Sequence, residues 1–497
     1  MHKILTLLFI CFSGLAQCQT TFNKLVTRDS VETAGSFLVI ETDTGYIASY
    51  VHFIPDGNNN AELGFIDISE TGNVQMRFKF KNDSLYQFSP WHQQVSQTST
   101  GTYLMSNTVR HLSTGESVGN FLVFDENFSP LKDTIFVDAD QKNEQLWGQA
   151  LVNDSTLIAV GSSSELIDLP LEGDFSISKF DASGRLIKSI VSSDTLFQLY
   201  RGIKYDSTAN CLYAFGLKHT PRGSPGWDSQ YWITKFDTAL NEIWHLSVPE
   251  ECHETNFADM TLGPDGNLFL AAGTCVDPPF FDLNLFKITP QGNIEWKKKL
   301  DYEYYLQQAK KIFYHQNHLY VLSHTFREEM INDTLKGQHY AGFFKLSLSG
   351  DILWKRLIAY SKENSSNNEL EDIIPTSDGG FMGVGHFRKS LQEPSAWVVK
   401  LNSEGCFDHE DCIDYTSVPT VEEPVQEPKV FPNPFKNELN FEIKNCKSIA
   451  IYNNHGQRVY NQPRLKSINT SNWAPGLYVY YATLNSGQVI QGKCIKY

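Results

Sequence analysis

Several features that would assign an activity are absent from this sequence. It holds no Gly-rich phosphate-binding loop and no His-Glu-x-x-His zinc motif. Only 20% of its residues are charged, the formal net charge is −16, and the largest basic run is Lys297–Lys299. A nucleic-acid surface needs concentrated positive charge to displace counterions. We therefore expect no nucleic-acid partner, no cofactor and no bound metal, and no motif points to a catalytic residue.

Long apolar runs are also scarce. The run Ile4–Phe12 follows the charged start Met1–Lys3 and precedes small residues up to Ala16, a pattern typical of a signal peptide. It is too short to span a bilayer, and no later segment is apolar enough, so we expect no transmembrane segment. Cleavage is expected after Ala16 or Cys18, and we take residues 1–18 as the signal peptide. Acylation of Cys18 is the alternative, although Gln17 stands where a small residue is expected.

The sequence does contain a motif that occurs seven times, at intervals of 52 to 58 residues. Each copy is a strand ending in an apolar residue and a small polar one, usually followed by a Gly turn. The copies begin at Phe65, Val123, Lys179, Lys235, Lys287, Lys345 and Lys400. A second hairpin with a short polar turn precedes each copy, which gives four strands, a to d, per repeat. Such a period predicts an all-β fold, a seven-bladed β-propeller over residues 19–405.

Two further patterns support this prediction. The seventh repeat lacks an obvious strand d, and Phe22–Val26 resembles Trp296–Leu300, the strand d of the fifth repeat. The N-terminal strand is therefore expected to complete the last blade and close the ring, which leaves no exposed sheet edges. Tryptophans recur after the motif, so we assign them to packing of the blades. These are Trp244, Trp296 and Trp354.

The two faces of the disc are expected to differ. The a–b and c–d turns are short, whereas several b–c loops on the other face are long: 162–174, 218–230, 274–282 and 323–340. Binding sites are common on long loops carried by a rigid frame. We predict that a glycan or protein ligand meets this loop-rich face. The candidate ligand-face residues are Trp227, Arg201, Asp259, Lys310 and Asp372.

These candidates have plainer interpretations too. Trp227 follows Pro225-Gly226 and suits a sugar-stacking platform, but packing within its loop is the favoured interpretation. The four charged residues near the start of strand a could converge on the central channel as in a hydrolase or lyase. Ion pairing or solvation at the channel rim is favoured instead. The leading hypothesis is thus a non-catalytic binding module, and a propeller hydrolase or lyase is the alternative.

Cysteine positions allow three disulfide predictions, because export leads to an oxidising compartment. Cys252 and Cys275 both fall on the loop-rich face. Cys406 and Cys412 flank a short acidic loop, and Cys446 and Cys494 share the C-terminal segment. The odd number beyond the signal region predicts at least one unpaired thiol. Cys211, in a buried strand, is the candidate.

The last part of the chain has a different character. Residues 406–429 form a linker, with the short cysteine loop followed by a Pro- and Glu-rich stretch. Residues 430–497 contain short strands separated by regular turns, which favours a small Ig-like β-sandwich. The segment opens with Phe431-Pro432-Asn433-Pro434 and continues with an Ile-Tyr-Asn…Gly-Gln turn. A strand containing Gly476 and Tyr478 and a final strand with Lys493 and Lys496 follow.

Residues 429–497 resemble the type A C-terminal sorting domain of the type IX secretion system of Bacteroidetes. The resemblance implies that the secretion machinery is a partner of this domain. It also implies passage through the periplasm, export across the outer membrane, and either release or attachment to the cell surface. The cysteines are a departure from the commoner pattern. The resemblance says nothing about what the propeller binds.

Overall fold

The computed structural model describes most of residues 19–497 as an all-β protein. The described residues are 19–26, 34–35, 37–54, 60–80, 86–88, 94–111, 116–136, 143–164, 173–192, 198–222, 226–252, 258–277, 280–300, 306–331, 334–362, 366–389, 394–407, 429–443, 446–453, 457–463, 467–484 and 489–497. The predicted signal peptide and most of the predicted linker lie outside them. Two compact units are present, residues 1–416 and residues 417–497.

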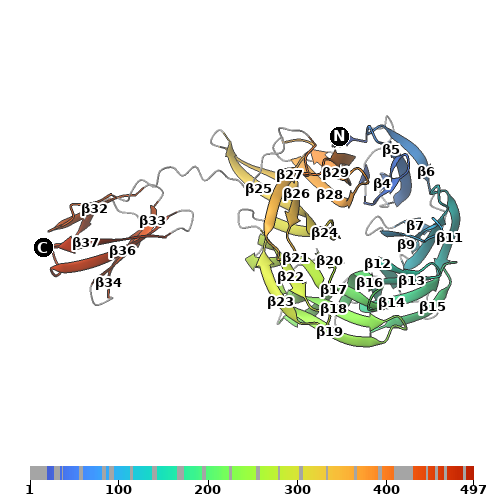
Figure 1. Ribbon diagram of the computed structural model, residues 1–497, viewed down its shortest axis with the longest axis horizontal. Coiled ribbons are helices and arrows are strands. Elements are labelled where there is room, and N and C mark those ends of the chain that lie inside the picture. Colours follow the sequence, from blue (N-terminus) through green and yellow to red (C-terminus); the bar gives the residue numbers. More distant parts are fainter. Residues whose placement is uncertain are drawn as a thin grey trace, which may run out of the picture. The chain divides into compact units, whose positions relative to one another are not determined.

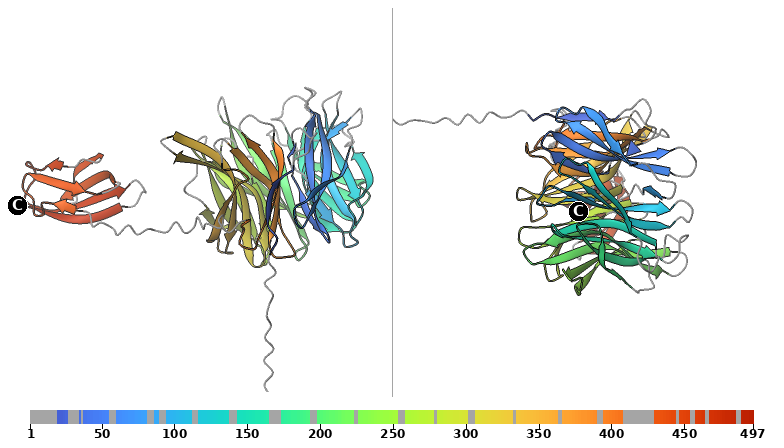
Figure 2. Two further views of the ribbon diagram at one scale, coloured as in Figure 1. Left: turned by 90° about the horizontal axis from the view of Figure 1, so that it is seen from above. Right: turned by 90° about the vertical axis from the view of Figure 1, so that its right-hand side faces the viewer.

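The first unit is a seven-bladed β-propeller, as predicted (Figure 1). The blades are antiparallel sheets in which consecutive strands pair, and Figure 2 shows them edge-on. The first three blades consist of β2 (Ala34–Gly35), β3 (Val39–Thr42), β4 (Gly45–Ile54), β5 (Asn60–Ser69) and β6 (Val74–Lys79); β7 (Tyr86–Phe88), β8 (Gln94–Gln97), β9 (Tyr103–His111), β10 (Ser117–Phe124) and β11 (Pro130–Phe136); and β12 (Asn143–Asn153), β13 (Thr156–Ser164), β14 (Asp174–Asp181) and β15 (Leu186–Val191).

The remaining blades follow the same order. They consist of β16 (Gln198–Asp206), β17 (Cys211–Arg222), β18 (Gly226–Asp237) and β19 (Glu242–Cys252); β20 (Ala258–Leu262), β21 (Leu268–Asp277), β22 (Phe280–Ile288) and β23 (Ile294–Lys299); β24 (Leu306–His315), β25 (His318–Ile331), β26 (Thr334–Leu346) and β27 (Ile352–Ile358); and β28 (Ser366–Pro375), β29 (Phe381–Lys389), β30 (Ser395–Leu401) and β1 (Phe22–Leu25). Blades 5 and 6 are also joined by one parallel pair, Phe281 with Leu306.

Blade 7 takes its outermost strand from the N-terminus. β1 pairs antiparallel with β30, from Phe22 opposite Lys400 to Leu25 opposite Trp397. The indole Nε1 of the fully buried Trp397 donates to Asn23 Oδ1 at 2.6 Å. Residues more than 370 positions apart in the chain therefore share one sheet, and the ring has no open end at this junction.

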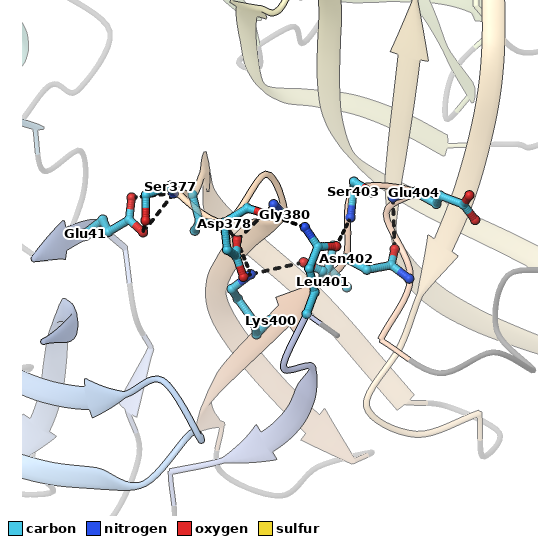
Figure 3. A network of polar contacts seen from close by, with 11 residues as sticks. Glu41, Ser377, Asp378, Gly380, Lys400, Leu401, Asn402, Ser403 and Glu404 are labelled. Carbon is cyan, nitrogen blue, oxygen red and sulfur yellow. Dashed lines mark hydrogen bonds and ion pairs between the residues drawn. The ribbon is translucent and has the colours of Figure 1, made fainter. Parts of the chain in front are cut away.

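Polar contacts at the short-turn face reinforce the same junction (Figure 3). Lys400, whose side chain is 1% exposed, forms an ion pair with Asp378 at 2.8 Å. Glu41 of blade 1 accepts hydrogen bonds from the backbone N–H and hydroxyl of Ser377 in blade 7. Gln19, next to the expected cleavage site, bridges two turns of blade 7, donating to Asp378 and accepting from the Ser403 N–H.

The recurring tryptophans pack between blades, as predicted. Trp244 contacts the c–d turn of the next blade at Gly292, and Trp296 and Trp354 repeat the contact at Gly350 and Gly405. These glycines have positive φ values, 83° at Gly350, which few other residues adopt without strain. A Cβ on Gly350 would lie 2.7 Å from Trp296 Cη2, so the indole also occupies the space that a side chain would need.

Three of the four predicted long loops are instead extended hairpins. Strands β25 and β26 stay paired out to Ile331 opposite Thr334. β17 and β18 continue to Arg222 opposite Gly226, and β21 and β22 to Asp277 opposite Phe280. These segments were predicted as long b–c loops, whereas strands b and c stay paired through most of each one. The loop-rich face is therefore built largely from projecting hairpins.

The second unit is a small β-domain of two sheets. One sheet has the order β31 (Lys429–Phe431), β32 (Glu438–Glu442), β35 (Ser467–Asn469), and the other β34 (Arg458–Pro463), β33 (Cys446–Asn453), β36 (Gly476–Leu484), β37 (Val489–Lys496). Side chains from both sheets form one core, including Phe435, Leu439, Ile451 and Tyr480.

The predicted Cys446–Cys494 disulfide is wrong. Both residues are buried thiols, on strands that flank β36 in one sheet. Cys446 lies opposite Leu484 and Cys494 opposite Tyr478, six residues apart along β36. That offset separates them by about 20 Å, whereas a disulfide needs Cα atoms closer than about 7 Å. Cys211 is a buried free thiol, as predicted.

The other predicted pairings are only partly described. Cys406 is disulfide-bonded. Its predicted partner Cys412 lies outside the described residues, and so do the side chains of Cys252 and Cys275. Those two pairings therefore stay predictions.

The glycine contacts give a first test. Gly350→Ala and Gly266→Ala both place a side chain at positive φ, 83° and 76°, which costs about 1–2 kcal/mol. Only at position 350 does the new Cβ meet an indole, because the nearest atom at position 266 lies 3.7 Å away. We expect Gly350→Ala to lower the free energy of unfolding by a further ~1–3 kcal/mol. Urea unfolding of both variants measures the difference, and equal losses would contradict the packing role of Trp296.

Candidate functional site

The two aspartates predicted at the ligand face connect neighbouring blades around the channel. Asp372 in β28 accepts a hydrogen bond from the backbone N–H of Val39 in blade 1 at 3.0 Å and forms an ion pair with Lys311 in blade 6. Its carboxylate therefore joins blades 6, 7 and 1. The innermost strand of a blade has one edge without a ladder partner. The Asp372 carboxylate accepts from one N–H group on that edge of blade 1.

Asp259 in β20 repeats this arrangement. It accepts from the Ile312 N–H of blade 6 at 3.0 Å and lies 3.6 Å from Lys204 Nζ of blade 4. Gln94 holds the matching position in blade 2, where it accepts from the N–H of Gln149 in blade 3 at 3.0 Å. Recurrence at one register position shows that these side chains hold neighbouring blades together. Each aspartate also forms an ion pair with a lysine of the preceding blade.

Arg201 is partly buried at the blade 3–4 junction. It occupies the bulge of β16, between Tyr200 and Gly202 in the ladder, and its guanidinium lies 4.2 Å from the ring centroid of Trp147. Trp147 sits in the corresponding bulge of β12. Burial lowers the pKa of Arg201 to about 10, and the stacked indole favours the cation. The predicted Trp227 belongs to β18, but its side chain lies outside the described part of the structure.

Lys310 marks the densest cluster of charges. It occupies the bulge of β24, and its Nζ lies 2.5 Å from Glu369 Oε1 and 3.0 Å from Glu371 Oε2 in β28. Glu371 is the bulge residue of β28, so the lysine and this glutamate hold equivalent positions in adjacent blades. Burial alone would lower the pKa of Lys310, but the two carboxylates raise it above its usual value.

Three histidines complete this cluster, which we call the blade 6–7 cluster (Lys310, Glu369, Glu371, His324, His339 and His386). His386 Nε2 lies 3.4 Å from Glu369, and its Nδ1 lies 3.7 Å from Glu371. Burial opposes a charge on His386, yet the hydrogen bond and charge of Glu369, with Glu371, raise its pKa. His324 lies 3.6 Å from the same glutamate, and burial lowers its pKa to about 4.

The blade 6–7 cluster has the donors for a metal ion. Ligand atoms of Glu369, Glu371 and His386 lie within 4.8 Å of one another. The ammonium of Lys310, however, already binds both carboxylates. With His386 protonated, two positive charges balance two negative charges. A divalent ion would have to displace a buried lysine, so the donor set fits an internal ion-pair network better than a metal centre.

Lys310 is the one residue of this cluster that was predicted from the sequence. The missed signal is the alternation Glu369, Glu371 in a strand a next to His386 in its paired strand b, because residues two apart on a strand share a face. The bulge at Glu371 was not readable from the sequence. Without knowledge of this bulge, the direction of the Glu371 side chain toward blade 6 could not be predicted.

Ser117 lies in a Gly-x-Ser-x-Gly pattern. Residues 115–119 read Gly-Glu-Ser-Val-Gly and fit the letters of a nucleophile elbow. An elbow requires a strand-to-helix turn, but Ser117 is the first residue of β10 and pairs with Arg110 across an antiparallel ladder. Ser117 therefore matches the sequence pattern of a nucleophile elbow but not its structure.

The C-terminal motif residues organise their own domain. Asn433 Oδ1 accepts from the Ile495 N–H at 2.9 Å, which ties the Phe431–Pro434 segment to the last strand. Tyr478 donates to Ala474 O at 2.7 Å. Lys496 is buried and lies 5.7 Å from the Phe435 ring, whereas Lys493 is exposed. The other motif residues differ in surroundings: Phe431 is 48% exposed, and a Cβ on Gly476 would meet no atom within 4 Å.

Residues 429–496 match the family model described as "Secretion system C-terminal sorting domain". The C-terminal unit is a sorting domain. Its presence supports secretion by the type IX system and an interaction with that machinery. No curated protein matches the chain. No helix among the described residues is long and apolar enough to cross a membrane.

Several solved structures are similar to the chain at low identity. One described as a polysaccharide lyase, an ulvan lyase, is 8% identical with a TM-score of 0.47, covering 78% of this chain and 99% of that one. A protein of unknown function from Dyadobacter fermentans is 8% identical (TM-score 0.42; 65% and 99%). An α-L-arabinofuranosidase of Fusarium graminearum is 12% identical (0.42; 61% and 93%). Likeness at this level carries no argument about activity.

The histidines predict opposite pH effects on stability. His386 has a folded pKa above its usual 6.5, so its contribution is complete below about pH 6.5 and is lost as the pH rises through the folded pKa. We expect the stability advantage of the wild type over His386→Gln to shrink between about pH 6 and pH 9. His324 has a folded pKa of about 4, so it destabilises the folded state as the pH falls from about 6.5 towards 4.

Urea unfolding at several pH values measures both effects. His324→Gln is the matched variant. It should lose less stability than the wild type as the pH falls from about 6.5 towards 4, and it should keep the stabilisation by protonated His386. A constant difference between wild type and His386→Gln across this range would contradict the ion pairing of His386 with Glu369 and Glu371.

Proposed function

We propose that this chain is an extracellular binding protein whose propeller contacts a glycan or protein through its loop-rich face, without catalysing a reaction. The observation that carries the proposal is the inter-blade pairing of Asp259, Asp372 and Lys310. These residues were candidates for acid–base chemistry in the channel, and their carboxylates and ammonium bind groups of this chain instead. General acid–base catalysis needs a titratable group within reach of substrate.

Location supports the same proposal. The signal peptide would direct the chain to the periplasm, and the sorting domain would then direct it across the outer membrane. Attachment to the cell surface after removal of the domain would display the propeller to the medium. The projecting hairpins β17–β18 and β25–β26 supply extended surface on a rigid frame, which is where binding residues are commonly carried.

The full secreted chain tests this proposal on a glycan array, with the bound polysaccharides then assayed for new reducing ends and unsaturated products. Binding without turnover is expected. Deleting residues 329–336 shortens the β25–β26 hairpin at its tip, and the pair Arg327–Gln338 should keep its register. We expect this deletion to weaken binding by about 10-fold or more, which corresponds to ~1.4 kcal/mol, with an unchanged urea midpoint.

Two outcomes would contradict the proposal. Turnover of any bound polysaccharide contradicts a non-catalytic role, and Glu369→Gln would then show whether the blade 6–7 cluster carries the reaction. Unchanged affinity in the hairpin deletion contradicts the placement of the ligand on that part of the loop-rich face.

A further inference from the structure

A cavity of about 510 Å³ lies between blades 6 and 7 on the short-turn face, opposite the loop-rich face. Blade 6 contributes Tyr320, Lys345, Trp354 and Arg356 to its lining, and blade 7 contributes Ser403 and Glu404. This volume is in the range of small-molecule sites, about 300–1,000 Å³.

At the blade 4–5 junction, hydrogen bonds join the two blades at the position that corresponds to this cavity. Between blades 4 and 5, Lys235 Nζ and Trp244 Nε1 both donate to Pro290 O, each at 3.1 Å. Pro290 is the second residue of the c–d turn of blade 5. Between blades 3 and 4, Lys179 Nζ donates to Thr238 O at 3.1 Å, again the second residue of the turn. The repeat therefore provides a lysine, and in one case a tryptophan, that bind the next blade's turn.

The blade 6–7 junction has the corresponding lysine and tryptophan, but neither donates a hydrogen bond to the described c–d turn of blade 7. By repeat position, Lys345 corresponds to Lys235, Trp354 to Trp244 and Ser403 to Pro290. Among the described residues, neither Lys345 Nζ nor Trp354 Nε1 has a hydrogen-bond acceptor, and Lys345 Nζ lies 5.8 Å from the Tyr320 ring centroid. Both residues line the cavity. An acceptor from outside the chain, placed in the cavity, could therefore take up both donors.

The surrounding charges define the ligand further. Arg356, 6% exposed, donates from Nε to Glu404 O at 3.1 Å and lies 5.0 Å from the Trp354 ring. The cavity thus combines two cationic side chains with one carboxylate, that of Glu404. An oxyanion can accept from Lys345 and Trp354, whereas the exposed carboxylate of Glu404 can accept from a hydroxyl. Acidic sugars carry both groups, and a simple anion carries only the first.

We propose that this cavity binds an acidic saccharide, with its carboxylate in the position that Pro290 O holds between blades 4 and 5. The remaining hydroxyls lie against Glu404 and Ser403. This site is separate from the loop-rich face, so either proposal stands or fails without the other.

Calorimetric titration of the full secreted chain with digalacturonate tests the site. Binding should be lost or weakened by about 10-fold or more in Lys345→Met, the effect of removing one charge-assisted hydrogen bond. Lys179→Met is the matched control. It removes the equivalent lysine at a sealed junction and should leave the affinity unchanged, even where it lowers stability.

Three comparisons decide the result. Equal binding of acetate or sulfate would show an anion site and overturn the saccharide assignment. Equal binding of the neutral digalactose would overturn the role of the carboxylate. Equal loss of affinity in Lys345→Met and Lys179→Met, or no binding of digalacturonate by the wild type, would overturn the site itself.

Discussion

Pairing of β1 with β30 is the constraint on which the rest of the propeller depends. The last sheet of the ring is joined to the first part of the chain, and the join is a ladder four residues long. Unpaired strand edges are sites of aggregation, so closing blade 7 in this way removes a hazard as well as fixing the geometry. The Asp372–Val39 and Glu41–Ser377 contacts cross the same junction.

Inside the ring, charged residues are used mainly to connect blades. A four-stranded sheet leaves the inner edge of strand a unpaired, and Gln94, Asp259 and Asp372 satisfy N–H groups of the next blade at the same position. Once the repeated contacts are known, departures from them become informative. The blade 6–7 junction departs twice, with the buried charge cluster on one side and the cavity beside Lys345 on the other.

Sequence reasoning succeeded where a short-range pattern sets the structure. Gly turns at regular intervals predicted the blades, and the likeness of Phe22–Val26 to Trp296–Leu300 pointed to the strand that β30 pairs with. It failed where the outcome depends on three-dimensional neighbours. Cys446 and Cys494 share a domain but lie on strands that are separated by β36 and meet it six residues apart. The hairpin β25–β26 was predicted as a loop.

The candidate sites show the same limit. Lys310 was found from its place at the start of strand a, but Glu371 reaches it through a bulge that no residue pattern marks. Lys345 belongs to the repeat motif, and its missing acceptor is visible only when one junction is compared with another.

Hydrogen exchange of the mature chain with and without residues 19–26 tests the closure directly. The account predicts that, without this segment, the amides of β30 lose their protection and those near Val39 exchange faster, while blade 4 keeps its protection. Unchanged protection of β30 would show that the ring is held closed by something other than the N-terminal strand.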